Sequence, residues 1–88
     1  MTNYNVIFKP SVEKDLRPLP KKIVERVFER IEQMRSEPHP RQAIKLSATG
    51  GLYRIRVGDY RIVYEVDPNA MLIIIHYIRH RSEVYRGL

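Results

Sequence analysis

Arginines crowd the stretch LYRIRVGDYRIVYEV, residues 52–66. A Gly-Asp pair divides it into two runs with alternating side chains, the pattern of a hairpin with a two-residue type II′ turn. That register places Arg56 directly opposite Arg61, with Arg54 on the same face. Like charges opposite each other across strands destabilise a sheet, so a neighbouring anion would stabilise this face. Because a guanidinium stays charged and its planar fork of donors matches phosphate oxygens, the spacing favours a phosphate-binding face.

The same face has a plainer interpretation, a solvated polar surface on which the arginines spread apart. Glu65 shares this face and can relieve one arginine, but not all three. The opposite face of the hairpin carries no charge and is predicted to lie against the core. Its residues are Tyr53, Ile55, Val57, Tyr60, Ile62, Tyr64 and Val66.

A second group of basic and aromatic residues ends the chain, in YIRHRSEVYRGL. The expected last strand runs beside the hairpin, so Arg79 or Arg81 can reach the arginine face. Tyr85 lies among arginines, and such a ring can stack on a base. The alternative for Tyr85 is a tail residue packed on the sheet. Arg81, Arg86 and His80 are further candidate contacts to RNA.

Histidines give little sign of a metal site. A lone histidine such as His80 is more often structural than catalytic, although imidazole suits acid–base work. His39 lies in a proline-rich loop and His76 in an expected strand. No two histidines have ligand spacing with carboxylates nearby, so we predict no metal and no cofactor.

The net charge of +6 and the pI of about 9.9 predict an anionic partner: nucleic acid, an acidic protein or, less favoured, a membrane surface. The 88 residues predict one domain, 1–88. The absence of cysteine excludes disulfides and thiolate metal sites and is typical of the cytoplasm. MTNYNVIFKP lacks the apolar core of a signal peptide, and the run Met71–Ile75 is too short to span a bilayer.

The elements expected to position these residues are a strand at 3–8, a short helix after Pro10, a second helix over about 21–37, and three strands. Those strands are Leu52–Val57, Tyr60–Val66 and Met71–Arg79. The loop 41–51 contains Ile44 and Leu46, which we expect to contact the core. The prediction is an α+β domain, β-α-α-β-β-β, with a four-stranded antiparallel sheet of order 1-4-3-2 and the helical hairpin on one face. The first strand is expected to be antiparallel because a helical hairpin returns the chain to the end where it began.

LYRIRVGDYRIVYEV, the helices before it and RHRSEVYRGL after it resemble the RelE/ParE superfamily of bacterial and archaeal toxins. The resemblance covers nearly the whole chain, from VIFKPSVEKDLRPLP to the tail. RSEVY is similar to the RelE branch, whose architecture is like that of a microbial ribonuclease. The resemblance implies the toxin of a type II toxin–antitoxin system, which cleaves mRNA in the ribosomal A site by 2′-hydroxyl attack on phosphate. It also implies an acidic RelB-like antitoxin and a toxin–antitoxin hetero-oligomer.

By the family motifs, the catalytic positions fall on Arg54, Arg56, Arg61, Arg79 and Tyr85, with Arg81 a candidate phosphate contact. Well-known RelE members have lysines where this chain has Arg54 and Arg56, and one of those lysines is thought to be the general base. Arginine is a poor base, because it is effectively always protonated. Charge stabilisation should survive the change, whereas the proton acceptor is left open among Tyr85, His80, Glu65 and the ribosome.

Two alternatives share this fold. One is a non-enzymatic inhibitor of DNA gyrase of the ParE kind, and the other is a degenerate toxin that only binds its antitoxin. Arg61, Arg79 and Tyr85 favour the nuclease over the gyrase inhibitor, whereas arginine in place of lysine keeps the degenerate toxin open.

Overall fold

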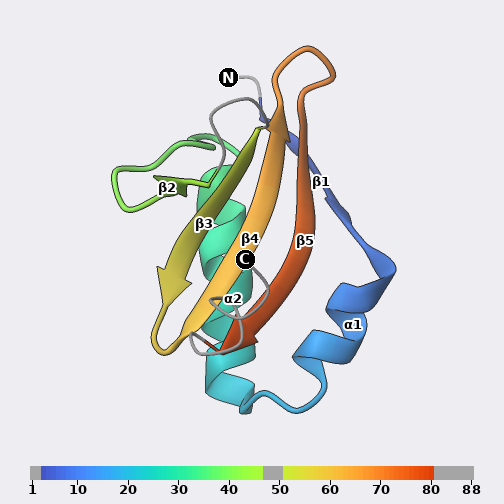
Figure 1. Ribbon diagram of the computed structural model, residues 1–88, viewed down its shortest axis with the longest axis vertical. Helices are drawn as coiled ribbons and strands as arrows, with labels where there is room; N and C mark the ends of the chain where they lie inside the picture. Colours follow the sequence, from blue (N-terminus) through green and yellow to red (C-terminus); the bar gives the residue numbers. More distant parts are fainter. Residues whose placement is uncertain (1–2, 47–50, 81–88) are drawn as a thin grey trace.

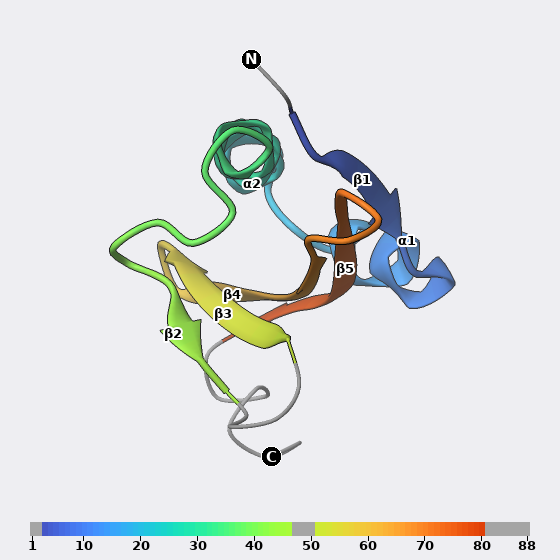
Figure 2. The same ribbon diagram turned by 90° about the horizontal axis from the view of Figure 1, so that it is seen from above.

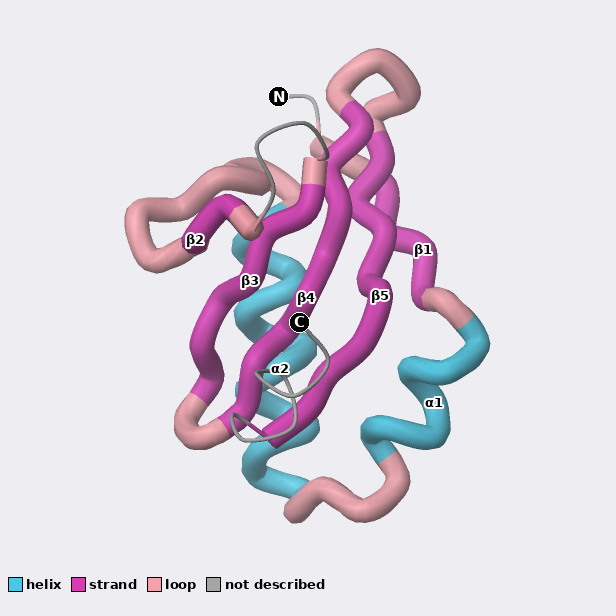
Figure 3. The backbone as a smooth tube through the Cα atoms, viewed as in Figure 1, coloured by secondary structure: helices cyan, strands magenta, loops and turns pink. Residues whose placement is uncertain are grey.

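The computed structural model describes residues 3–46 and 51–80. A strand and two helices, β1 (Asn5–Phe8), α1 (Pro10–Leu16) and α2 (Lys21–Met34), precede all the other strands. Those strands are β2 (Ile44–Lys45), β3 (Leu52–Val57), β4 (Tyr60–Asp67) and β5 (Leu72–His80). Figures 1 and 3 show the long strands side by side, with α2 crossing behind them. The predicted α+β class is therefore confirmed. None of the helices in the described part of the chain is long and apolar enough to cross a membrane.

The register predicted for the hairpin is confirmed at every pair. Val57 lies opposite Tyr60, and Arg56 lies opposite Arg61. Gly58 has a φ of +60°, the left-handed value that a type II′ turn requires at its first central position. The turn therefore fixes which side chains share a face, because shifting the register by one residue would send every side chain to the other side of the sheet.

The sheet has five strands rather than four, in the order β1-β5-β4-β3-β2. The added strand, β2, lies in the segment predicted as a loop, and it pairs antiparallel with β3. The prediction that Ile44 contacts the core is wrong, since it is 51% exposed. Ile44 is the cross-strand partner of Arg54, so its side chain shares the face of that arginine.

The predicted antiparallel pairing of the first strand is also wrong, because β1 pairs with β5 in parallel. Figure 1 shows the reason. The short helix α1 continues in the direction of β1, and only α2 runs back along the sheet. The chain therefore reverses direction once between β1 and the end of α2. A symmetric helical hairpin would reverse it twice, once at the start of each helix.

The core lies between the helices and one face of the sheet (Figure 2). Helix α1 contributes Val12, and α2 contributes its buried stripe Val27, Ile31 and Met34. The strands contribute Ile55, Val57, Ile62, Tyr64, Val66, Ile73, Ile75 and Ile78. This is the uncharged face that the alternation predicted for the hairpin, so the arginines lie on the side of the sheet away from α2.

Tyr64 gives a direct test of the core. Its ring is fully buried, and its hydroxyl donates a hydrogen bond to the Pro38 carbonyl at 2.8 Å. Burial, with a smaller effect from neighbouring Tyr53, raises the pKa of the Tyr64 phenol and keeps it protonated. Tyr64→Phe should lower the free energy of unfolding by about 1 kcal/mol, because the carbonyl loses its partner. Urea unfolding checks this, with Tyr53→Phe as the control from the same sheet face. Equal losses in the two variants would contradict the role of the hydrogen bond.

Candidate active site

Three arginines form a row across three adjacent strands. Arg56 of β3 lies opposite Arg61 of β4, which in turn lies opposite Arg79 of β5. Arg54 lies two residues along β3 on the same face. Of the two candidates for reaching the arginine face, Arg79 lies there, and Arg81 is outside the described residues. A row of like charges at cross-strand distance is unfavourable unless an anion or solvent compensates it.

Backbone carbonyls orient two members of this row. The Nε–H of Arg56 donates to the Gly58 carbonyl at 2.8 Å, and Nη1 of Arg61 donates to the Tyr60 carbonyl at 3.3 Å. Within residues 3–46 and 51–80, no carboxylate forms an ion pair with Arg56 or Arg61. The remaining guanidinium donors of both residues are therefore available to an incoming anion.

Arg79 is held differently from the other two. Its Nε lies 4.0 Å from Oδ1 of Asp15, and its guanidinium lies over the ring of Tyr77, 4.6 Å from the centroid. The other carboxylate oxygen of Asp15 accepts the backbone N–H of Ile78 at 3.0 Å. Asp15 thus connects α1 to the edge of β5 beyond the end of β1, and it limits where the Arg79 side chain can reach.

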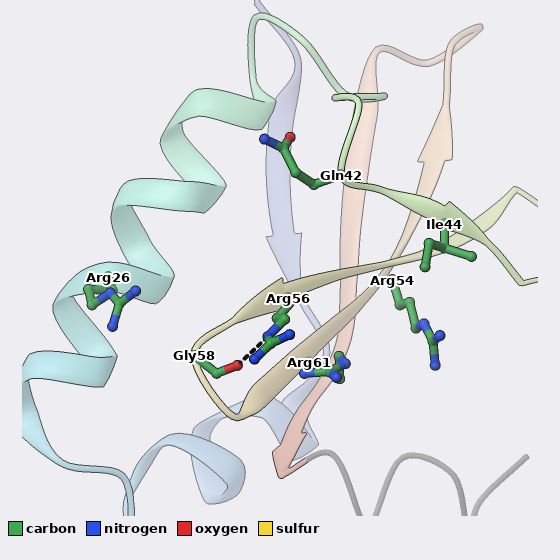
Figure 4. A pocket seen from close by; sticks show the side chains of 7 residues that line it. All are labelled: Arg26, Gln42, Ile44, Arg54, Arg56, Gly58 and Arg61. Atoms are coloured by element: carbon green, nitrogen blue, oxygen red, sulfur yellow. Dashed lines mark hydrogen bonds between the residues drawn. The ribbon is translucent and has the colours of Figure 1, made fainter.

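An open pocket of about 550 Å³ lies beside the hairpin (Figure 4). Its lining comes from α2, the segment before β2, and the hairpin: Arg26, Gln42, Ile44, Arg54, Arg56, Gly58 and Arg61. Three of the predicted site residues meet here. The sequence interpretation missed two lining residues, Arg26 of α2 and Gln42. No periodicity signals that a helix side chain reaches around the edge of β3.

Two of the candidate proton acceptors, His80 and Glu65, are not among the residues that line this pocket. His80 lies opposite Tyr60, and their rings meet edge-on at 5.5 Å, on the side of the sheet that carries the core. Glu65 lies on the arginine face, but its Oε1 is 2.9 Å from Nε2 of His76. The predicted site residues Arg81, Tyr85 and Arg86 lie outside the described residues.

In the part of the chain that the structure describes, no group of three or more His, Cys, Asp or Glu residues is placed to hold a metal ion. Arg54, Arg56, Arg61 and Arg79 share one face of the sheet, so fixed positive charge dominates the described part of the site. Such a site can bind phosphate and stabilise negative charge that develops on it.

Comparisons with known proteins show the family to which the chain belongs. A family model described as the ParE toxin of the type II toxin–antitoxin system parDE matches residues 6–85. The toxin RelE of Mycobacterium tuberculosis is 34% identical over 87 residues, which cover 94% of this chain and 87% of that protein.

Two solved complexes contain similar chains. In the archaeal RelE–RelB complex from Pyrococcus horikoshii, the similar chain is 37% identical, with a TM-score of 0.83 and coverage of 92% of this chain and 98% of that chain. In the RelBE2 toxin–antitoxin complex from Mycobacterium tuberculosis, the similar chain is 29% identical, with a TM-score of 0.78. The match covers 91% of this chain and 100% of that chain. The family model and these relatives together show that this chain belongs to the RelE/ParE family of toxins of type II toxin–antitoxin systems.

Proposed function

We propose that this toxin is an endoribonuclease that cuts mRNA in the ribosomal A site and so stops translation in the cytoplasm. The observation that carries the proposal is the arginine row Arg56–Arg61–Arg79 on the face of the sheet away from the core. Keeping like charges in register weakens the sheet and adds nothing to the core. A phosphodiester at this face would supply the missing negative charge.

In the proposed reaction the substrate's own 2′-hydroxyl is the nucleophile. Its oxygen forms a bond to the adjacent phosphorus, the bond from phosphorus to the 5′ oxygen breaks, and a 2′,3′-cyclic phosphate and a 5′-hydroxyl result. One proton leaves the 2′ oxygen and one is delivered to the departing 5′ oxygen. The pentavalent phosphorus carries more negative charge than the substrate. Preorganised guanidinium groups therefore stabilise the transition state more than the ground state.

Arg54 and Arg56 do not accept the proton, because a guanidinium stays protonated in proteins. His80 lies on the other side of the sheet from the arginine row, next to Tyr60. We therefore assign the described arginines to phosphate binding and charge stabilisation. Of the two described candidates for proton transfer, Glu65 lies on the arginine face and His80 does not. Tyr85, in the tail motif, remains the third candidate.

A gyrase inhibitor of the ParE kind is the second candidate, because the matching family model is described as a ParE toxin. The arginine row favours the nuclease, since binding to a protein surface does not need a face built for phosphate.

Ribosomes programmed with a defined mRNA test the proposal. The purified toxin should cut the codon in the A site and leave a 2′,3′-cyclic phosphate on the upstream fragment. The control is the same mRNA without ribosomes, which should be cut far more slowly. Intact mRNA on programmed ribosomes, with the toxin folded and in excess, would contradict the proposal.

The proposed partner that restrains the toxin is an acidic antitoxin, partly disordered until it binds. The two solved relatives described above come from toxin–antitoxin complexes, and this chain's charge of +6 complements an acidic partner. A disordered partner must offset its ordering cost, so the interface should exceed ~1,200 Å².

Association with the co-encoded acidic protein should slow as salt rises, because charge steering is screened. Stopped-flow mixing at low and high salt measures the rate constant, and mRNA cleavage measured in parallel should stop at stoichiometric antitoxin. A rate indifferent to salt, or cleavage that persists at full occupancy, would show that charge does not drive this partnership.

A further inference from the structure

We propose that Arg26 of α2 binds a second phosphate of the same mRNA, next to the one held by the arginine row, so that the RNA backbone leaves the site around the edge of β3. This inference rests on the proposed function and adds a subsite to it.

The shape of the surface supports a continuous path. The pocket of about 550 Å³ connects Arg61 and Arg54 on the sheet face with Arg26 on the helix. A smaller hollow of about 110 Å³ continues it along α2. Both are lined by Arg26, Arg56 and Gly58, so the two spaces meet at the hairpin turn. Figure 4 shows Arg26 reaching toward this turn from the side opposite Arg54.

The Arg26 guanidinium lies close to Gly58 of the hairpin turn. A methyl group built on Gly58 would lie 3.8 Å from Nη1 of Arg26 and 3.7 Å from Cδ1 of Ile23. The same turn residue accepts the Nε–H of Arg56 through its carbonyl at 2.8 Å. Arg26 and Arg56 therefore flank one turn, one from the helix and the other from the sheet.

The charge around Arg26 also supports an anion site. The spacing of charges along α2 predicts solvated pairs between helix neighbours. In the part of the chain that the structure describes, however, Arg26 forms no ion pair, and its side chain is exposed. Glu29 lines the smaller hollow, as does Arg30, so one carboxylate there faces the three cations Arg26, Arg30 and Arg56. The balance is positive, and a phosphate would bring it closer to neutral.

The test combines a protein variant with a neutralised phosphate. Arg26→Gln should lower the single-turnover cleavage of mRNA on programmed ribosomes, at subsaturating toxin, about five- to tenfold, because one charge-assisted contact is lost. The matched control is Arg17→Gln, which removes the same charge from the exposed residue that follows α1 and should change the rate less than twofold. Replacing one phosphate near the scissile one by a methylphosphonate should slow the wild type by a similar factor. That same replacement should not slow Arg26→Gln any further.

Any other result would contradict the proposal that Arg26 binds a second phosphate of the mRNA. Equal rates for Arg26→Gln and Arg17→Gln would show that Arg26 contacts no RNA. Arg26→Gln could instead be slower than the wild type while every methylphosphonate slows both proteins by the same factor. Arg26 would then contact the ribosome and not the mRNA. The wild-type reaction on unmodified mRNA is measured first. If it fails, the proposed function fails and the subsite with it, whereas failure of the coupling alone leaves the nuclease standing.

Discussion

Arg61→Ala should abolish toxicity while leaving the protein folded. Arg61 is the middle member of the row, with Arg56 on one side and Arg79 on the other. Loss of a preorganised donor to a developing oxyanion lowers the rate ~10²–10³-fold in comparable sites. Single-turnover cleavage on programmed ribosomes measures this loss directly, and growth after induction measures its consequence.

The stability of the same variant separates a functional arginine from a structural one. Removing the central charge relieves repulsion from both neighbours, so the free energy of unfolding should stay constant or rise by a few tenths of a kcal/mol. Arg17→Ala is the control. It removes an exposed charge directly after α1 and should leave the cleavage rate unchanged. A folded Arg61→Ala variant with wild-type cleavage would remove Arg61 from the active site. A large loss of stability would show that the row supports the fold.

Tyr85→Ala should cause the second large loss. If the ring stacks on a base of the A-site codon, its removal costs ~1–3 kcal/mol of binding, or about fivefold to more than a hundredfold in affinity. Tyr85→Phe keeps the ring and should keep most of that affinity. Binding of the variants to programmed ribosomes carrying a substrate without the attacking 2′-hydroxyl separates affinity from chemistry.

Two outcomes would change the role of Tyr85. If Tyr85→Phe keeps its affinity but loses most of the rate, the hydroxyl takes part in proton transfer and stacking is not its main contribution. If wild type, Tyr85→Phe and Tyr85→Ala are equally active, Tyr85 does not belong to the site.

The hairpin could be predicted residue by residue, because strict alternation and a Gly-Asp turn leave one register. The pairing of β5 with β4 followed from the strand order, but the sequence left open whether Arg79 or Arg81 reaches the arginine face. A register irregularity between Val63 and Tyr64 helps to set which residue lies opposite Arg61. The direction of β1 could not be predicted in this way. It depends on the path of α1, and seven residues of helix carry no signal of the angle at which they leave a strand.

The sequence predicted only some of the residues that line the pocket. Period-two spacing identifies Arg54, Arg56 and Arg61 as sharing a face, but nothing local shows that Arg26, thirty positions before Arg56, lies across the turn from it. Ile44 was misassigned because an apolar residue in a loop is expected to be buried, whereas pairing with Arg54 makes it line the pocket. Long-range packing thus determines which residues join the arginine row at its edge.

Mapping RNA ends and DNA breaks in the same induced cells tests the central claim most directly. The toxin should produce new 5′ ends within the reading frames of translated mRNAs, and blocking translation initiation beforehand should remove them. Chromosomal DNA should stay intact, and Arg61→Ala should give neither signal. Unbroken mRNA together with DNA breaks trapped on gyrase would contradict the nuclease and establish the gyrase inhibitor instead.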